Sequence, residues 1–252
     1  MNEVKVIAHR GANKYAPQNT LPAFERAIEL GANGFETDVH VTKDGVPVLC
    51  HNYTVNETSN GIGTISSYTL EDLRKLDFGS YFSSVYAGTK IPTLDEFLEL
   101  VASSDIEVMN IELKKPKEKE SGIVEKTIKA VKAHGLFNRL LISSFDPFLL
   151  TEAKKIDPRC QTGFLYSPPH VETLYGHLFP VRFAKLIGAD ALHPMDCYVN
   201  KQYVKSAHAE GIKVNVWTVN SDAAITRFIK AGVDGLITDC PDRVRKIMKS
   251  VK

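Results

Sequence analysis

The chain has 252 residues, which suits one large domain or two small ones and is close to the length of about 250 that a (β/α)₈ barrel needs. Its 31 Lys and Arg residues nearly balance its 30 Asp and Glu residues, so we expect no nucleic-acid partner, and any recognition of anions must be local. No apolar run approaches the roughly 18 residues of a membrane span, which predicts no stable membrane insertion.

The four cysteines are scattered and form no C-x-x-C pair; they are Cys50, Cys160, Cys197 and Cys240. In a chain of this length such cysteines are typical of small buried side chains in a reducing compartment. No charged segment with an apolar run and a cleavage site precedes His9. We therefore expect a cytoplasmic protein with buried cysteines.

The first part of the chain alternates β-rich and helical runs. A strand is predicted over about 4–8, a helix over about 21–30 and a second strand over about 35–39. Asp44-Gly45 between β-prone runs then predicts a hairpin that ends at His51. From about 52 to 90 the pattern is lost. We interpret this segment as an insertion after the second strand that interrupts the barrel, not as a separate folding domain.

The same alternation resumes after the insertion. Further strands are predicted at about 106–113, 140–144, 161–165, 189–193, 212–218 and 235–238, with helices at about 94–101, 122–133, 147–155, 201–210, 223–231 and 241–249. The segment from 166 to about 183 is interpreted as a long loop. Eight strands, mostly followed by helices, favour a single TIM-barrel domain over residues 1–252 rather than an open doubly wound sheet.

Charged residues recur near the C-terminal ends of the predicted strands, where barrel enzymes place their chemistry. Glu36 and Asp38 alternate along one strand and therefore share a face, and Glu112 ends the next barrel strand. Three neighbouring carboxylates repel one another unless a cation lies among them, and oxygen ligands suit Mg²⁺ or Ca²⁺ better than Zn²⁺. The alternative is a structural salt-bridge network with Arg10 and Lys114.

Two histidines end predicted strands, His9 on the first and His51 on the hairpin. Histidine titrates near pH 6.5, so the pair can supply the base and the acid that phosphodiester cleavage needs. The alternatives are structural histidines or nitrogen ligands of a transition metal, and the second is less favoured because the other nearby ligands are carboxylates. Arg10 and Lys114 suit phosphate oxygens.

Two other features have structural interpretations. Cys50 precedes His51, and strand alternation points it to the opposite face, so we expect it to be buried and not a nucleophile. Asp234 and Asp239 flank the last barrel strand, where a role in a cap or turn is expected.

The order and spacing of these residues resemble the glycerophosphodiester phosphodiesterases, in particular the bacterial cytosolic type. The similarity covers nearly the whole chain and is carried by His9-Arg10-Gly11, Pro17-Gln18-Asn19-Thr20, Phe35-Glu36-Thr37-Asp38-Val39, residues 42–52, residues 91–94, Asn110-Ile111-Glu112-Leu113-Lys114, residues 216–220 and residues 232–239. Gln18 is a departure, because the family usually has a glutamate there.

The resemblance implies a barrel enzyme that hydrolyses glycerophosphodiesters to sn-glycerol 3-phosphate and an alcohol. It implies Glu36, Asp38 and Glu112 as ligands of a divalent metal ion, His9 and His51 as the acid–base pair, Arg10 and Lys114 as phosphate contacts, and Trp217 on the glycerol side. We expect the two histidines on opposite sides of the phosphorus. Which of them is the acid, and whether water or the glycerol 2-hydroxyl attacks, stays open.

Two other functions remain possible from the sequence. One is a related barrel lyase that acts on lipid phosphodiesters and releases a cyclic phosphate, with the segment from Tyr166 to Phe183 as an apolar lid. The other is a barrel that binds a phosphorylated metabolite without catalysis, because a fold alone does not imply activity. The intact acid–base pair argues against the second.

Overall fold

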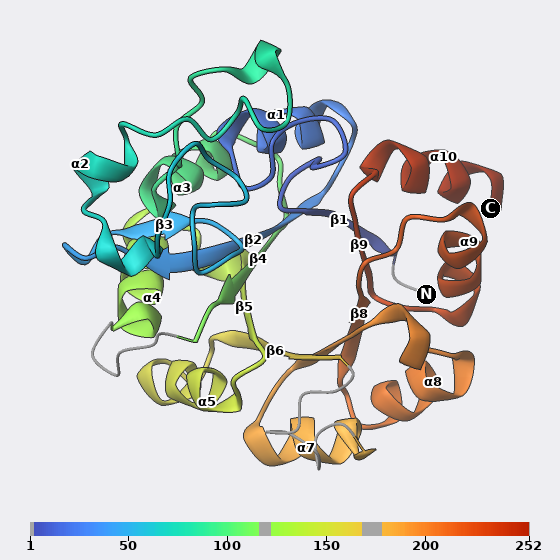
Figure 1. Cartoon of the computed structure of the whole chain (residues 1–252). Coiled ribbons are helices and arrows are strands. Elements are labelled where there is room, and N and C mark those ends of the chain that lie inside the picture. Colours follow the sequence, from blue (N-terminus) through green and yellow to red (C-terminus); the bar gives the residue numbers. More distant parts are fainter. Residues whose placement is uncertain (1–2, 116–121, 168–177, 252) are drawn as a thin grey trace.

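The fold of this computed structural model is a closed barrel, described for residues 3–115, 122–167 and 178–251 (Figure 1). Within these ranges eight parallel strands close because β1 pairs with both β2 and β9. The strands are β1 (Lys5–His9), β2 (Gly34–Val41), β4 (Val108–Leu113), β5 (Leu140–Ser144), β6 (Gln161–Tyr166), β7 (Ala191–Pro194), β8 (Lys213–Val216) and β9 (Gly235–Thr238). The predicted (β/α)₈ barrel is therefore confirmed.

Helices surround the barrel, and their first residues explain where they begin (Figure 1). Thr93 and Glu96 form a reciprocal capping box at the start of α3, and Asp146 caps α5 just before Pro147. The helices of the outer ring are α1 (Leu21–Glu29), α3 (Leu94–Ala102), α4 (Ile123–Ala133), α5 (Pro147–Ile156), α7 (Pro180–Ile187), α8 (Lys201–Ala209), α9 (Asp222–Ala231) and α10 (Pro241–Val251).

Helix α7 corrects the prediction of a long loop after the fifth barrel strand. It begins at Pro180, whose fixed φ suits the first turn of a helix, and it includes Phe183. The ring of Phe183 packs on Phe164 of β6, with the ring centroids 5.0 Å apart. The loop prediction is thus wrong from Pro180 onward, and residues 168–177 of that loop, with the lid suggested there, lie outside the described residues.

The predicted insertion leaves the barrel after the short strand β3 (Pro47–Leu49), which pairs antiparallel with β2. It contains the helix α2 (Leu70–Leu73) and has an apolar cluster of its own, separate from the main core between strands and helices. We call this the insertion cluster; its buried members are Val48, Cys50, Val55, Ile65, Leu73, Phe78 and Ile91. The insertion is thus packed on β3, outside the ring of barrel strands (Figure 1).

The cysteines are all free, and three of the four are buried as predicted. Cys197 is the exception, because it lies in an exposed single turn, Asp196–Tyr198, that follows β7. Burial raises the pKa of Cys50 to about 11, so its thiol is protonated at neutral pH, in agreement with the expectation that it is no nucleophile. Over the part of the chain that is described, none of the helices has both the length and the apolarity to cross a bilayer.

A close approach inside the barrel makes Gly163 of β6 sensitive to substitution. A Cβ at this position would come within 2.5 Å of Nε2 of the buried His193. We expect Gly163→Ala to lower the free energy of unfolding by about 1–3 kcal/mol, because the barrel interior has to shift to relieve the overlap. Urea unfolding measures this change.

A double-mutant cycle tests the cause of that loss. In a His193→Ala background the overlapping ring is gone, so Gly163→Ala should cost much less there. An equal cost in both backgrounds would show that the loss does not come from contact with His193.

Candidate active site

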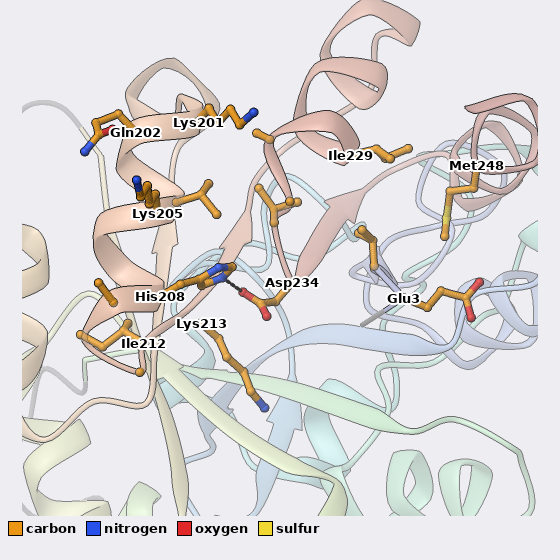
Figure 2. A pocket seen from close by; sticks show the side chains of 17 residues that line it. Glu3, Lys201, Gln202, Lys205, His208, Ile212, Lys213, Ile229, Asp234 and Met248 are labelled. Atoms are coloured by element: carbon orange, nitrogen blue, oxygen red, sulfur yellow. Dashed lines mark hydrogen bonds and ion pairs between the residues drawn. The ribbon is translucent and has the colours of Figure 1, made fainter. Parts of the chain in front are cut away.

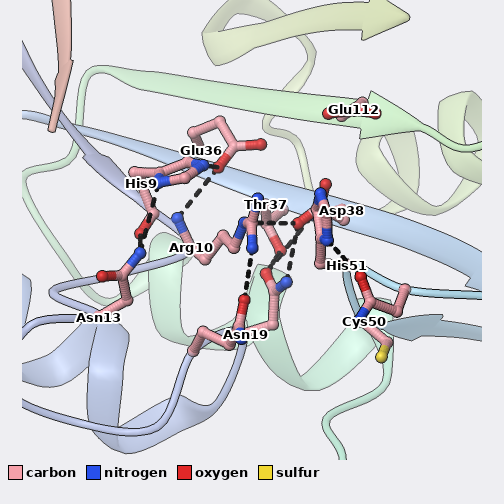
Figure 3. Close-up of polar contacts among 12 residues, drawn as sticks. His9, Arg10, Asn13, Asn19, Glu36, Thr37, Asp38, Cys50, His51 and Glu112 are labelled. Atoms are coloured by element: carbon pink, nitrogen blue, oxygen red, sulfur yellow. Dashed lines mark hydrogen bonds and ion pairs between the residues drawn. The ribbon is translucent and has the colours of Figure 1, made fainter. Parts of the chain in front are cut away.

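The strand order brings the predicted charged residues to one end of the barrel. His9 ends β1 and is in register with Glu36 on β2, while Asp38 on β2 is in register with Glu112 on β4. The β2–β3 hairpin returns the chain so that His51 follows β3 closely. In the view of Figure 3, His9 and His51 lie on opposite sides of the Arg10 side chain.

Three carboxylates form the centre of the site, as the sequence predicts. One oxygen from each of Glu36, Asp38 and Glu112 lies within 4.8 Å of the others, and all three residues are buried. Burial and the neighbouring Asp38 charge raise the pKa of Glu36 well above its usual value. Burial likewise raises the pKa of Glu112 to about 7. This donor set therefore fits a hard divalent cation, whose charge would offset the repulsion.

Two cations contact the same carboxylates. Lys114 Nζ forms an ion pair with Glu112 and lies 2.8 Å from Asp38 Oδ1, and Arg10 Nε lies 3.5 Å from Asp38 Oδ2. Burial acts to raise the pKa of Asp38, but the charges of Lys114 and Arg10 outweigh it, so this pKa falls below its usual range. Charge neutralisation, the structural alternative for Arg10 and Lys114, is thus present in the geometry; their contact with phosphate stays a prediction.

The turn after β1 carries residues whose backbone is left-handed. Arg10 and Asn19 both have φ of 55°, and Gly11 has φ of 78°. A Cβ on Gly11 would come within 2.6 Å of the backbone of Ala23 in α1, so glycine is required for this close approach. The turn points the Arg10 amide at Glu36 Oε2, which accepts its hydrogen bond at 3.0 Å.

The departure at Gln18 has a clear structural consequence. Its side-chain oxygen accepts a hydrogen bond from Arg10 Nη1 at 2.6 Å. A glutamine keeps the acceptor that a glutamate would offer but removes the negative charge. Arg10 therefore keeps its orientation with one fewer anion beside it.

Asp239 is a site residue that the sequence reasoning missed. Instead of a cap or turn, its Oδ1 lies 2.6 Å from His9 Nδ1, and Asn13 and Asn220 both donate hydrogen bonds to its carboxylate. This arrangement places a proton on Nδ1 and leaves Nε2 of His9 as the free acceptor, 4.0 Å from Glu36 Oε2. The position of Asp239 directly after β9 was the available signal, comparable to the position of His9 at the end of β1.

Burial lowers the pKa of both histidines. For His9 the effect of burial is partly offset by the hydrogen bond to Asp239. For His51 burial is opposed by Asp38 and reinforced by Lys114, and its pKa falls to about 4. His51 Nδ1 lies 2.6 Å from Asn52 Oδ1. His51, like His9, is therefore oriented by a contact at Nδ1, which leaves Nε2 for other contacts.

Trp217 lies just beyond β8, at the same end of the barrel as the charged residues. Its indole Nε1 donates to the His193 carbonyl at 2.7 Å, and the ring of Phe145 meets it edge-on with centroids 5.9 Å apart. The described contacts place it on the β5–β8 side of the barrel mouth, not among the carboxylates.

A depression of about 1540 Å³ lies away from this site (Figure 2). It follows α8 and the residues that precede β1, β8 and β9, and none of the predicted site residues lines it. His208 Nε2 lies 2.8 Å from Asp234 Oδ2, which also accepts from the Val214 amide at the start of β8. Asp234 is therefore structural, as expected.

The fold and the site together define the class of (β/α)₈-barrel phosphodiesterases. The sequence model of the glycerophosphoryl diester phosphodiesterase family matches residues 9–243, so the chain belongs to that family. It is 42% identical to a glycerophosphodiester phosphodiesterase of Caldanaerobacter subterraneus subsp. tengcongensis over 97% of each chain.

Solved structures agree with this assignment. An Oleispira antarctica phosphodiesterase in complex with the product sn-glycerol-3-phosphate has a TM-score of 0.87 at 29% identity, with 97% of this chain and 96% of that chain covered. A Thermotoga maritima glycerophosphodiester phosphodiesterase has a TM-score of 0.77 at 29% identity, covering 98% and 99% of the two chains. The resemblance expected from the sequence is confirmed.

Proposed function

We propose that this protein hydrolyses glycerophosphodiesters to sn-glycerol 3-phosphate and an alcohol. In this proposal Glu36, Asp38 and Glu112 hold a divalent ion, Mg²⁺ or Ca²⁺, and His9 and His51 transfer the protons. One observation carries the proposal. The three carboxylates, whose oxygens lie within 4.8 Å of one another, share one end of the barrel with both histidines and with Arg10 and Lys114, and this is the end at which barrel enzymes carry out catalysis.

The charges of the site support a metal and a phosphodiester together. When all five groups are ionised, the three carboxylates together with Arg10 and Lys114 have a net charge of minus one. A divalent cation changes this to one positive charge, and a phosphodiester monoanion then brings the site to neutrality. When bound, the cation supplies Lewis-acid stabilisation of charge that develops on phosphate oxygens.

The remaining steps belong to the chain's own residues. Asp239 fixes the tautomer and orientation of His9, and Asn52 does the same for His51, so Nε2 of each imidazole is left for proton transfer. One Nε2 removes the proton of the attacking oxygen and the other protonates the leaving alkoxide. The Arg10 guanidinium and the Lys114 ammonium, held against Asp38, orient the phosphate.

The whole chain acts as one domain in this proposal, with a small-molecule diester as its partner. The four free cysteines support a reducing, cytoplasmic setting.

Phosphorus NMR of the products tests the proposed function. A panel of glycerophosphodiesters is incubated with the protein and Mg²⁺, Ca²⁺ or Mn²⁺, and we expect sn-glycerol 3-phosphate as the final phosphorus product. Accumulation of a cyclic phosphate would favour the lyase instead. No turnover with any diester and any ion would favour a binding protein without catalysis.

A further inference from the structure

Two polar side chains lie inside the barrel on the strands that follow the carboxylates. Ile111 of β4 belongs to the main core between strands and helices, so its neighbours Asn110 and Glu112 face the barrel interior. Ser143 of β5 faces inward for the same reason, because Ile142 lies in the main core. The interior of such a barrel is usually filled by bulky apolar side chains, so polar residues at these positions need a reason.

The side-chain polar atoms of Asn110 and Ser143 have no hydrogen-bond partner among the described residues. These atoms are Oδ1 and Nδ2 of Asn110 and Oγ of Ser143. Asn110 is 1% exposed and Ser143 is fully buried. A buried polar group without a partner costs stability, and most such groups in folded proteins are paired. The reason for an asparagine and a serine here is therefore not the stability of the barrel itself.

The strand register places both side chains beside carboxylates of the site. Asn110 is in register with Glu36 of β2 and lies two residues before Glu112, and Ser143 is in register with Glu112. Neighbouring strands are about 4.8 Å apart, so side chains in register on one face are direct neighbours. His193 Nδ1 also has no partner among the described residues, but β5 and β6 separate its strand from β4. Asn110 and Ser143 combine unpaired polar atoms with a place next to the carboxylates.

From this placement we propose that Asn110 and Ser143 are positioning residues of the metal site, which hydrogen-bond the carboxylates of Glu36 and Glu112 when these hold a divalent cation. The inference rests on the proposed function, in which the carboxylates bind Mg²⁺ or Ca²⁺. Carboxylates that hold a metal are usually hydrogen-bonded in turn. Asn110 Nδ2 and the Ser143 hydroxyl donate to carboxylate oxygens, and Asn110 Oδ1 accepts from water in the hydration shell that such ions commonly keep.

The test is a calorimetric titration of the metal-free full-length chain with Mg²⁺ alone and with Ca²⁺ alone, which needs no turnover. Asn110→Leu keeps the branching of the side chain but forms no hydrogen bond. We expect it to raise the Kd for the cation by about 10–100-fold, the usual loss when an outer partner of a metal ligand is removed. Ser143→Ala removes one hydrogen bond to a charged group and should raise Kd at least about threefold.

Thr127→Val is the matched control. Thr127 Oγ1 is also buried without a hydrogen-bond partner among the described residues, but it lies on α4, in the outer ring of helices. Valine keeps the shape of the side chain and removes the hydroxyl. Loss of an unpaired buried hydroxyl at this position should leave the Kd for the cation at the wild-type value.

Thermal unfolding without metal shows which variants are folded, and Asn110→Ala replaces Asn110→Leu if the leucine does not fit. An unchanged Kd in a folded variant would overturn the role of the residue that it replaces, and an equal rise in Thr127→Val would overturn both roles. If the wild-type chain bound neither cation, the metal site of the proposed function would be wrong, and the inference would fail with it.

Discussion

Replacing His9 or His51 with alanine should each lower kcat by about 10²–10⁴-fold, the usual loss when one general acid or base is removed. Both side chains are oriented through Nδ1, by Asp239 and Asn52 respectively, so that Nε2 is available for proton transfer. Steady-state kinetics at saturating metal measure the effect. Asp239→Asn should cause a smaller loss, because it weakens the orientation of His9 without removing the imidazole.

His208→Ala is the matched control for this result. His208 also contacts an aspartate, at 2.8 Å from Asp234, but it borders the depression along α8 and not the charged site. We expect its kcat to match that of the wild type. If His9→Ala and His51→Ala both retained near-normal kcat with metal bound, the assignment of proton transfer would be wrong.

Glu112→Gln should raise the metal concentration needed for half-maximal activity by more than about 10–100-fold, since even the loss of an outer partner of a metal ligand costs that much. The amide keeps the size of the side chain but removes a charged ligand from a cluster whose oxygens lie within 4.8 Å. Activity titrations with Mg²⁺ or Ca²⁺ check the shift.

Thermal unfolding gives a second readout that needs no turnover. A ligand that binds only the folded state stabilises it in proportion to the logarithm of its concentration over Kd, so the metal-dependent rise in Tm should shrink in Glu112→Gln. Glu107→Gln is the control, because Glu107 is an exposed acid paired with Lys5 at the opposite end of the barrel. Identical metal titrations for Glu112→Gln and the wild type would count against the ligand role.

The barrel was predictable because each of its strands is a short apolar run between helical or turn-like segments. Helix α7 was not, since it has only eight residues and follows a proline-containing segment without a long apolar period. The outward position of Cys197 could not be read either, because it depends on a single turn after β7 rather than on strand alternation.

The charged site was predictable for residues that sit on the strands themselves. Alternation and strand order are enough to place Glu36 and Asp38 on one face and Glu112 in register beside them. The role of Asp239 was hidden, because it depends on β9 closing against β1 across 230 residues of sequence. The position of Asp239 after β9 indicates which end of the barrel it occupies, but its contact with His9 follows only from ring closure, which is a tertiary property.

His9 and His51 are held by different parts of the structure. His9 is the last residue of β1, which is hydrogen-bonded on both edges within the barrel. His51 instead follows β3, and both Val48 of β3 and Cys50 after it belong to the insertion cluster. Repacking that cluster would move one imidazole relative to the other while the barrel stays intact. The spacing of the two imidazoles therefore depends on the packing of the insertion as well as on the barrel.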